Sequence, residues 1–256
     1  FIGSFILVTS LFALWGFAND ITNPLVAAFK AIFDNLTNAQ SSTIQFAFYG
    51  GYATMAIPAA LFIQKFSYKA GILLGLALYS LGALLFIPAA VTMEFIWFPL
   101  SLYILTFGLA FLETTANPYI LSMGDESTAT QRLNLAQAFN PIGSLLGMFV
   151  ASKLILANLS TSKFRTEQFN TNPQFETLSA NEVNLKISEA YNNFKIADPE
   201  LYAANQIADI AIIRNPYAIL GIVVLIMFFV FLIKKMPETG QKSNRTSALE
   251  SARRLF

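Results

Sequence analysis

The pattern that organises this chain is Gly16-Phe-Ala-Asn-Asp20-Ile-Thr-Asn23-Pro24, because a related stretch, Ala110-Phe-Leu-Glu113-Thr-Thr-Ala-Asn117-Pro118, follows later. Each stretch places an acid shortly before Asn-Pro, and the two prolines are 94 residues apart. A second pair of similar stretches, around Ala47-Phe48 and Ala138-Phe139, is separated by 91 residues. Two matches at nearly the same offset indicate an internal repeat.

Long apolar segments surround both copies of the pattern. Of the 256 residues, 55% are hydrophobic and only 12% are charged, against roughly 25% charged in an average soluble domain. A helix needs about 20 predominantly apolar residues to cross a bilayer. Six segments meet this length, at 4–30, 43–64, 69–91, 95–123, 131–157 and 216–233. We therefore predict an all-α membrane protein with six transmembrane helices.

The repeat relates the first segment to the fourth and the second to the fifth, which predicts two three-helix units. Because each unit has an odd number of helices, the second copy enters the membrane from the opposite side, as in the inverted repeats of secondary transporters. Pro24 and Pro118 are expected to break equivalent helices, since proline removes a helical hydrogen bond. At membrane depth such a break is tolerated where the freed backbone is buried or lines a cavity. A simple packing kink is the alternative.

We predict that residues 1–235 form a six-helix transporter domain and that 236–256 begin a cytoplasmic linker to a C-terminal half missing from this piece of a longer protein. The polar stretch 158–213 is expected to be a long extracytoplasmic loop with short surface helices. Two helix starts are expected within it, a capping box from Ser179 to Glu182 and an N-cap at Asp198 before Pro199.

Lysine and arginine favour the cytoplasmic side, so we expect the N-terminus and the C-terminal tail in the cytoplasm of a plasma membrane, such as a bacterial inner membrane. This orientation gives the cytoplasm Lys65, Lys69, Arg132, Lys234, Lys235, Lys242, Arg245, Arg253 and Arg254.

The composition also excludes several chemistries. The chain has no histidine and no cysteine, which removes thiolate and imidazole metal sites and the catalytic triads that need these side chains. We expect no catalytic residues, no metal site and no cofactor. The formal net charge of +1 provides no basic footprint for nucleic acid.

Glu113 and Asp20 are the candidate proton-coupling residues. An ionised acid at the centre of a transmembrane helix costs about 2.5 to 3.5 kcal/mol on insertion scales and is a functional candidate by default. No lysine or arginine lies in the central part of a predicted span, so Glu113 is suited to be a reversible proton carrier, whereas Asp20 lies nearer a helix end. The alternative is that both acids hydrogen-bond between helices, to neighbours such as Asn117 or Thr22.

The same lack of buried cations argues against an anionic substrate, which would require arginine or lysine. Amides and aromatics suit a neutral, polyhydroxylated ligand, because amides both donate and accept hydrogen bonds. Gln137 and Asn140 are three residues apart and share a helix face. The alternative is that these amides join helices to one another. The other candidate substrate contacts are Asn19, Asn23, Gln45, Tyr49 and Asn117.

These motifs resemble the fucose permease branch of the major facilitator superfamily, a group of sugar/proton symporters built from two six-helix halves. The resemblance covers most of residues 10–157 and rests on Leu14-Trp15, Phe48-Tyr49, Ser67-Tyr-Lys-Ala-Gly71, Leu112-Glu113-Thr114 and Arg132-Leu-Asn-Leu-Ala-Gln137. It implies that Glu113 is the essential acid of the fourth helix and that Gln137 and Asn140 face the sugar. The family's first-helix acid aligns with Asn23, three residues after Asp20.

The sequence therefore predicts the N-terminal half of a proton-coupled symporter that imports a neutral sugar, L-fucose or a related hexose, by alternating access. The expected partners are the sugar, protons, the lipid bilayer and the missing C-terminal half. Two alternatives keep the same fold: a sugar facilitator without proton coupling, and a non-transporting membrane sensor or scaffold. A membrane enzyme would leave the inverted repeat unexplained.

Overall fold

The computed structural model describes residues 2–33 and 36–236, and within these ranges it is helical with no strand. Among the described residues, six helical stretches are long and apolar enough to cross a bilayer, which confirms the predicted number and order of spans. The six stretches are Ile2–Ile32, Asn38–Lys65, Tyr68–Thr92, Trp97–Ser122, Glu126–Asn158 and Pro199–Ile233. The prediction of an all-α integral membrane protein is thereby confirmed.

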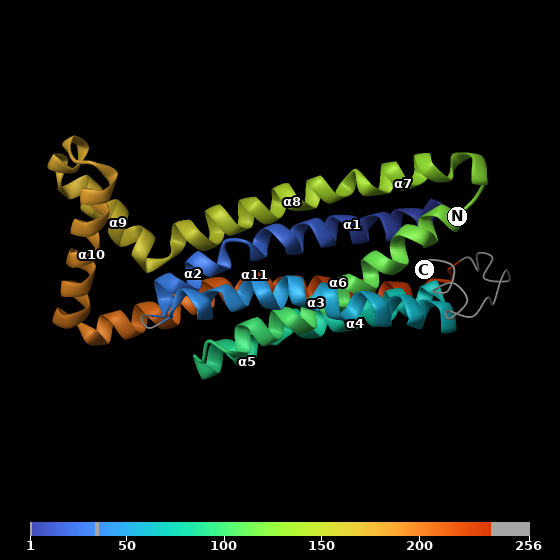
Figure 1. Ribbon diagram of the computed structural model, residues 1–256, viewed down its shortest axis with the longest axis horizontal. Coiled ribbons are helices and arrows are strands. Elements are labelled where there is room, and N and C mark those ends of the chain that lie inside the picture. Colours follow the sequence, from blue (N-terminus) through green and yellow to red (C-terminus); the bar gives the residue numbers. More distant parts are fainter. Residues whose placement is uncertain (1, 34–35, 237–256) are drawn as a thin grey trace, which may run out of the picture.

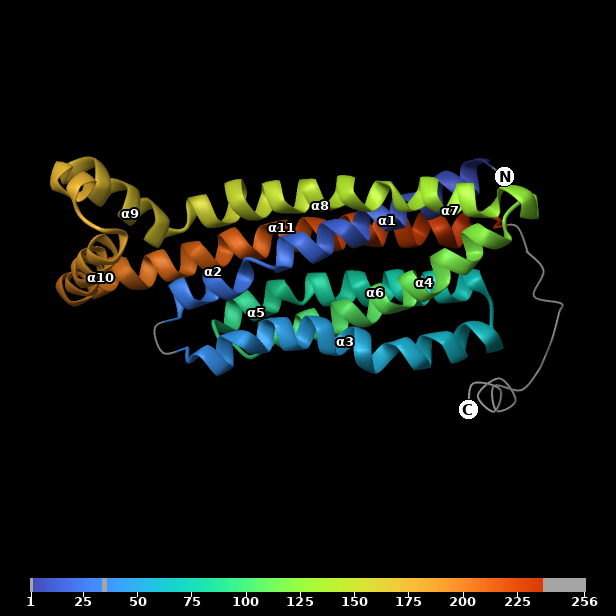
Figure 2. The ribbon, with the colours of Figure 1, turned by 45° about the horizontal axis from the view of Figure 1, so that its top comes forward.

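The helices pack in pairs that reflect the repeat. In Figures 1 and 2, α1 (Ile2–Thr22) lies along α8 (Phe139–Phe149), and α3 (Asn38–Lys65) packs on α6 (Trp97–Ser122). The pair α4 (Tyr68–Leu84) and α11 (Pro199–Ile233) completes the bundle. The repeat relates the first span to the fourth, the second to the fifth and the third to the sixth. It therefore relates the pair α1–α8 to the pair α6–α3, and the pair α4–α11 to itself. These three pairs have the symmetry of the predicted inverted repeat, whereas the extensive contact between α4 and α6 has no counterpart of similar size between α11 and α1.

Glycines let the paired helices approach to backbone contact. A Cβ on Gly16 of α1 would overlap the carbonyl oxygen of Asn140, and one on Gly143 would overlap that of Ala13. Small residues at such positions are typical of helix pairs in membranes. Gly50 differs, because a Cβ there would lie 3.9 Å from its nearest side-chain atoms, which is ordinary contact. Backbone-to-backbone packing is therefore present at Gly16 and Gly143 but not at Gly50.

The two prolines of the repeat behave differently. Pro24 separates α1 from α2 (Leu25–Ile32), as expected, but Pro118 lies inside α6, which continues to Ser122. The prediction that Pro118 breaks its helix is therefore wrong. The turn before it is supported by the Asn117 side chain, whose Nδ2 donates to the Glu113 carbonyl oxygen at 3.0 Å. Such side-chain bonds and burial between neighbouring helices let proline persist in a membrane helix.

Two other spans contain breaks that the sequence analysis did not predict. The third divides at Leu85 into α4 and α5 (Phe86–Thr92), and the fifth divides at Ala138 into α7 (Ala129–Gln137) and α8. The reason is the same in both places. Pro88 lies four positions after Leu84, the last residue of α4, and Pro141 lies four positions after Gln137, the last residue of α7. Because proline has no backbone N–H, the carbonyl oxygens of Leu84 and Gln137 lack their helical hydrogen-bond donors.

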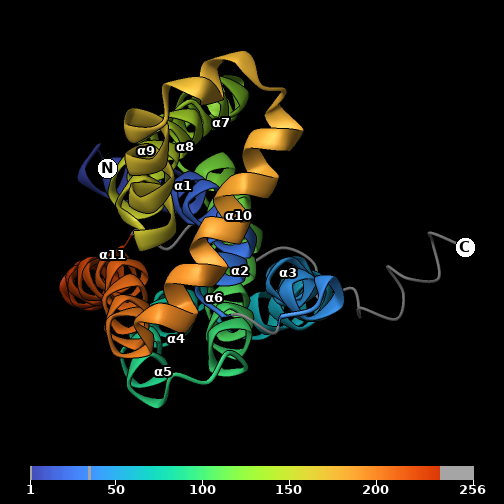
Figure 3. The same cartoon turned by 90° about the vertical axis from the view of Figure 1, so that its left-hand side faces the viewer.

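The fifth span ends irregularly, in a π-helical segment η2 (Val150–Ile155) and a 3₁₀ turn η3 (Leu156–Asn158). It is followed by α9 (Ser160–Thr171), the turn η4 (Pro173–Thr177) and α10 (Ala180–Ala197). We call α9, η4 and α10 the cap. Figures 1 and 3 show the cap at one end of the bundle, with α10 running across that end. The cap has a small core of its own, formed by Phe175, Val183 and Ile187.

Both predicted helix starts in this region are confirmed. Ser179 and Glu182 form a reciprocal capping box at the start of α10, and Asp198 caps α11 through the Leu201 N–H. These Ser179 hydrogen bonds hold the pKa of Glu182 below its usual value. The predicted boundary at 216 is wrong, however, because α11 begins at Pro199 and runs through Pro216 as one helix. The polar stretch after α10 is therefore the first part of the last spanning helix.

The end of the bundle opposite the cap gathers the basic residues of the short loops. Lys69 Nζ donates to the carbonyl oxygens of Leu232 and Lys234, each at 3.0 Å, and so satisfies the end of α11. Between α6 and α7 lies the turn η1 (Glu126–Thr128), where hydrogen bonds from Ser127 lower the pKa of Asp125. The predicted linker at 236–256 lies, except for Met236, outside the described residues.

Candidate functional site

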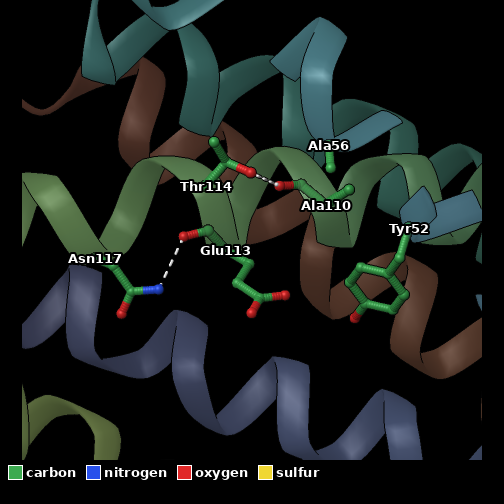
Figure 4. Close-up of a pocket in the computed structure, with 6 residues that line it drawn as sticks. All are labelled: Tyr52, Ala56, Ala110, Glu113, Thr114 and Asn117. Carbon is green, nitrogen blue, oxygen red and sulfur yellow. Dashed lines mark hydrogen bonds between the residues drawn. The ribbon is translucent and has the colours of Figure 1, made fainter. Parts of the chain in front are cut away.

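A pocket of about 340 Å³ lies between α3 and α6, and Glu113 is the acid in its wall. Figure 4 shows its lining, which consists of Tyr52, Ala56, Ala110, Glu113, Thr114 and Asn117. The two alanines carry the smallest side chains of the set and leave the room that the pocket occupies. Apart from Glu113, the lining residues are neutral, so no cation in the wall neutralises the carboxylate.

The α6 residues reach the pocket because of helical spacing. Ala110, Glu113, Thr114 and Asn117 fall at intervals of three and four residues and so share one face of the helix. The neighbouring face, with Thr115 and Ala116, is buried against other helices. The Thr114 hydroxyl donates to the Ala110 carbonyl at 2.7 Å, and the Asn117 amide donates to the Glu113 carbonyl. Two polar side chains in the wall are therefore held by their own helix.

The fifth span meets this face through its amides. Gln137, at the end of α7, donates from Nε2 to Oδ1 of Asn117 at 3.1 Å, so α6 and α7 are joined at the edge of the pocket. Asn140, at the start of α8, points instead toward α1, where its Nδ2 approaches the Phe12 carbonyl oxygen at 3.4 Å. The structure therefore brings together Glu113, Asn117 and Gln137 among the sequence-predicted residues.

Tyr52, a neutral residue of the second span that is not among the candidate substrate contacts named from the sequence, lines the pocket. Its hydroxyl oxygen accepts a hydrogen bond from the indole N–H of Trp15 on α1. Trp15 and Glu113 also border a second, smaller hollow between α1 and α6. Tyr49 is 58% exposed and is not among the lining residues. Trp15 was the feature of the sequence that could have pointed to Tyr52, because the N–H of a tryptophan away from water usually has a hydrogen-bond acceptor.

The remaining candidates lie apart from this pocket. Asp20 lies on α1 and Asn23 follows the end of that helix, and the two contact each other, with Nδ2 of Asn23 at 3.3 Å from Oδ1 of Asp20. Asn19 is half-buried on the same helix, and Gln45 is exposed on the first half of α3. None of these four residues is in the pocket's lining.

Comparisons with known proteins come from sequence and from structure. No family model matches the chain. The chain is 53% identical to the L-fucose-proton symporter of Haemophilus influenzae over 99% of its own length, and it covers 55% of that protein. It is 36% identical to the glucose/galactose transporter of Brucella abortus over 62% of its length, covering 39% of that relative. The chain therefore spans about half, or less, of the curated relatives that it matches.

Two crystal structures of FucP, the first named as the Escherichia coli fucose:proton symporter, match 98% of this chain with TM-scores of 0.71. The chain is 34% and 36% identical to them and covers 54% and 55% of their length, respectively. One is described as a major facilitator superfamily transporter in the outward conformation. These relatives are named as transporters, in agreement with the prediction that the chain is not an enzyme. In sequence and in fold, this chain belongs with the fucose permease family of the major facilitator superfamily, and it corresponds to the N-terminal, six-helix half of that fold.

Proposed function

We propose that the complete protein is a proton-coupled symporter that imports a neutral sugar, L-fucose or a related hexose, and that this chain is its N-terminal half. Support comes from the names of the relatives, an L-fucose-proton symporter and a glucose/galactose transporter. A second, C-terminal six-helix half would complete the substrate site. We also propose that the N-terminus and the tail face the cytoplasm, with the cap on the opposite side.

The observation that carries this proposal is the position of Glu113, in the wall of a pocket whose other lining residues are neutral. A carboxylate at membrane depth without a cation is costly when ionised. Binding a proton removes that charge, so Glu113 can load and release a proton during each cycle. The pocket volume of about 340 Å³ also leaves room for a ligand beside the carboxyl group.

For the sugar we propose Gln137 and Asn117 as the inner contacts, since amides can donate to and accept from hydroxyl groups. Asn140, whose amide approaches the Phe12 carbonyl oxygen, is a further proposed contact. Asn19, Asn23, Gln45 and Tyr49 form an outer set that the sugar would meet as the two halves move. Asp20, paired with Asn23, is the proposed second proton-coupling residue. We propose alternating access, in which sugar and proton each raise the affinity for the other, as linkage requires.

The experiment follows external pH in a weakly buffered suspension of cells that express the complete protein. L-fucose, galactose, glucose and a sugar phosphate are added in turn. Symport predicts alkalinisation with one neutral sugar, and Glu113→Gln should abolish it. Glu189→Gln, which changes an exposed acid of the cap, is the matched control and should leave the response intact.

Each other outcome points elsewhere. Sugar entry without a pH change would indicate a facilitator or another coupling ion, and would overturn the proton role of Glu113. If no sugar enters, the sensor or scaffold function becomes the better explanation. Alkalinisation with the sugar phosphate would contradict the choice of a neutral substrate.

A further inference from the structure

The hydrogen bond between Trp15 and Tyr52 fixes which way the tyrosine hydroxyl can act. An indole nitrogen is only a donor, so the Tyr52 oxygen must be the acceptor of this bond. The proton of the same hydroxyl is then directed away from Trp15. Because Tyr52 lines the pocket that contains Glu113, this proton is available on the pocket side.

The Tyr52 ring is also held in place by its neighbours. It packs edge-on against Phe48, with ring centroids 5.7 Å apart and an angle of 71° between the rings. Phe48 is only 2% exposed, which makes it a rigid support. With Trp15 at the hydroxyl and Phe48 at the ring, Tyr52 is a pre-positioned donor, the arrangement that functional groups require.

The other neutral polar side chains of the wall, those of Thr114 and Asn117, already donate hydrogen bonds to the backbone of α6. Thr114 donates to the Ala110 carbonyl, and Asn117 donates to the Glu113 carbonyl. Figure 4 shows these two bonds and, across the pocket, the Tyr52 ring and the Glu113 carboxyl group entering the same space. Of the two hydroxyl-bearing residues in the lining, Tyr52 is the one whose proton is not committed to α6.

We propose that Tyr52 is a positioning residue for proton coupling, with its hydroxyl, oriented by Trp15, donating to the carboxylate of Glu113 after the proton has left. This inference rests on the proposed function of Glu113. A hydrogen bond to a charged acceptor is roughly twice as strong as a neutral one. Tyr52 therefore stabilises the unloaded, ionised state and sets the pH at which Glu113 releases its proton.

The test measures sugar uptake by the complete protein as a function of external pH, in wild type, Tyr52→Phe and Trp15→Phe. Without the hydroxyl, ionised Glu113 loses its donor and keeps its proton to a higher pH. The pH of half-maximal uptake should rise by about one unit in Tyr52→Phe. Trp15→Phe should shift it in the same direction by less, because the hydroxyl remains but is free to rotate.

Tyr103→Phe is the matched control. Tyr103 also donates its hydroxyl proton across the α3–α6 contact, to Thr54 at 3.1 Å, but it is outside the pocket lining. Its pH profile should coincide with that of wild type. The thermal unfolding midpoint of purified Tyr52→Phe, compared with that of wild type, shows whether the variant is folded.

An unchanged pH profile in Tyr52→Phe, or an equal shift in Tyr103→Phe, would overturn the inference. If Tyr52→Phe does not fold, an unshifted profile in Trp15→Phe has the same meaning. The failure of the proposed function itself is distinguishable, because proton-coupled uptake would then survive in Glu113→Gln.

Discussion

The carboxylate of Asp209, on α11, accepts two hydrogen bonds from Ser160, one from the backbone N–H and one from the hydroxyl, each at 2.9 Å. Ser160 is the first residue of α9, so an acid 49 residues away satisfies the start of that helix. Asp209 is only 3% exposed. This contact attaches the cap to the last spanning helix, because the cap's own core is separate from that of the bundle.

Removing this attachment should loosen the cap. We expect Asp209→Ala to leave the Ser160 donors without their partner, at a cost of about 1 to 3 kcal/mol. Hydrogen exchange of the complete protein should show faster exchange throughout α9, with little change in α6. Glu167→Gln, an exposed acid within α9, is the control. Equal protection of α9 in wild type and Asp209→Ala would show that the contact contributes nothing to docking the cap.

The contact between α1 and α8 should not tolerate an added methyl group. A Cβ on Gly143 overlaps the backbone of Ala13, so Gly143→Ala must separate the two helices, at a cost of about 1 to 3 kcal/mol. Gly50→Ala is the matched control, since its Cβ would meet only side-chain atoms at 3.9 Å. Thermal unfolding of the purified protein should show a lower midpoint for Gly143→Ala alone. A lower midpoint of the same size in Gly50→Ala would refute the packing argument.

The capping box of α10 should make this helix sensitive to acid. Because the pKa of Glu182 is lowered by its hydrogen bonds to Ser179, folding favours the ionised form. This contribution is fully present above the ordinary glutamate value of about 4.3. It is lost as the pH falls through the lower pKa of the folded state.

The corresponding measurement is the exchange protection of α10 between pH 3 and pH 6. Protection should decline at the acidic end in wild type, and Glu182→Gln should flatten that dependence, because the amide oxygen accepts hydrogen bonds at every pH. A Glu182→Gln profile as steep as that of wild type would assign the acid sensitivity to another group.

If Gln137 contacts the sugar as proposed, Gln137→Ala should weaken sugar recognition. Loss of one neutral hydrogen bond corresponds to a rise in KM of about 2- to 10-fold. Gln131→Ala, at an exposed position near the start of α7, provides the control. The kinetics of uptake separate KM from the maximal rate. Equal KM values for wild type and Gln137→Ala would remove Gln137 from the substrate site and leave it as a link between α7 and α6.

The amino-acid sequence by itself determined the membrane class, the order of the six spans and the repeat. These properties depend on the length of apolar segments and on short local motifs, which do not require knowledge of distant contacts. The same local information located Glu113 within the fourth span and the helix starts at Ser179 and Asp198. The start of α11 was misplaced because the window around Asp209 and Arg214 is polar, although the helix is continuous from Pro199.

Only the tertiary structure decided which side chains meet. Tyr49 and Tyr52 are three residues apart on one helix, and the packing of α3 against α6 brings Tyr52, not Tyr49, to the pocket of Glu113. Asn117 meets Gln137 because α7, the first helix of the fifth span, packs beside α6. Helix periodicity fixes which residues share a face. The neighbour that each face receives depends on the packing of residues that are far apart in the chain.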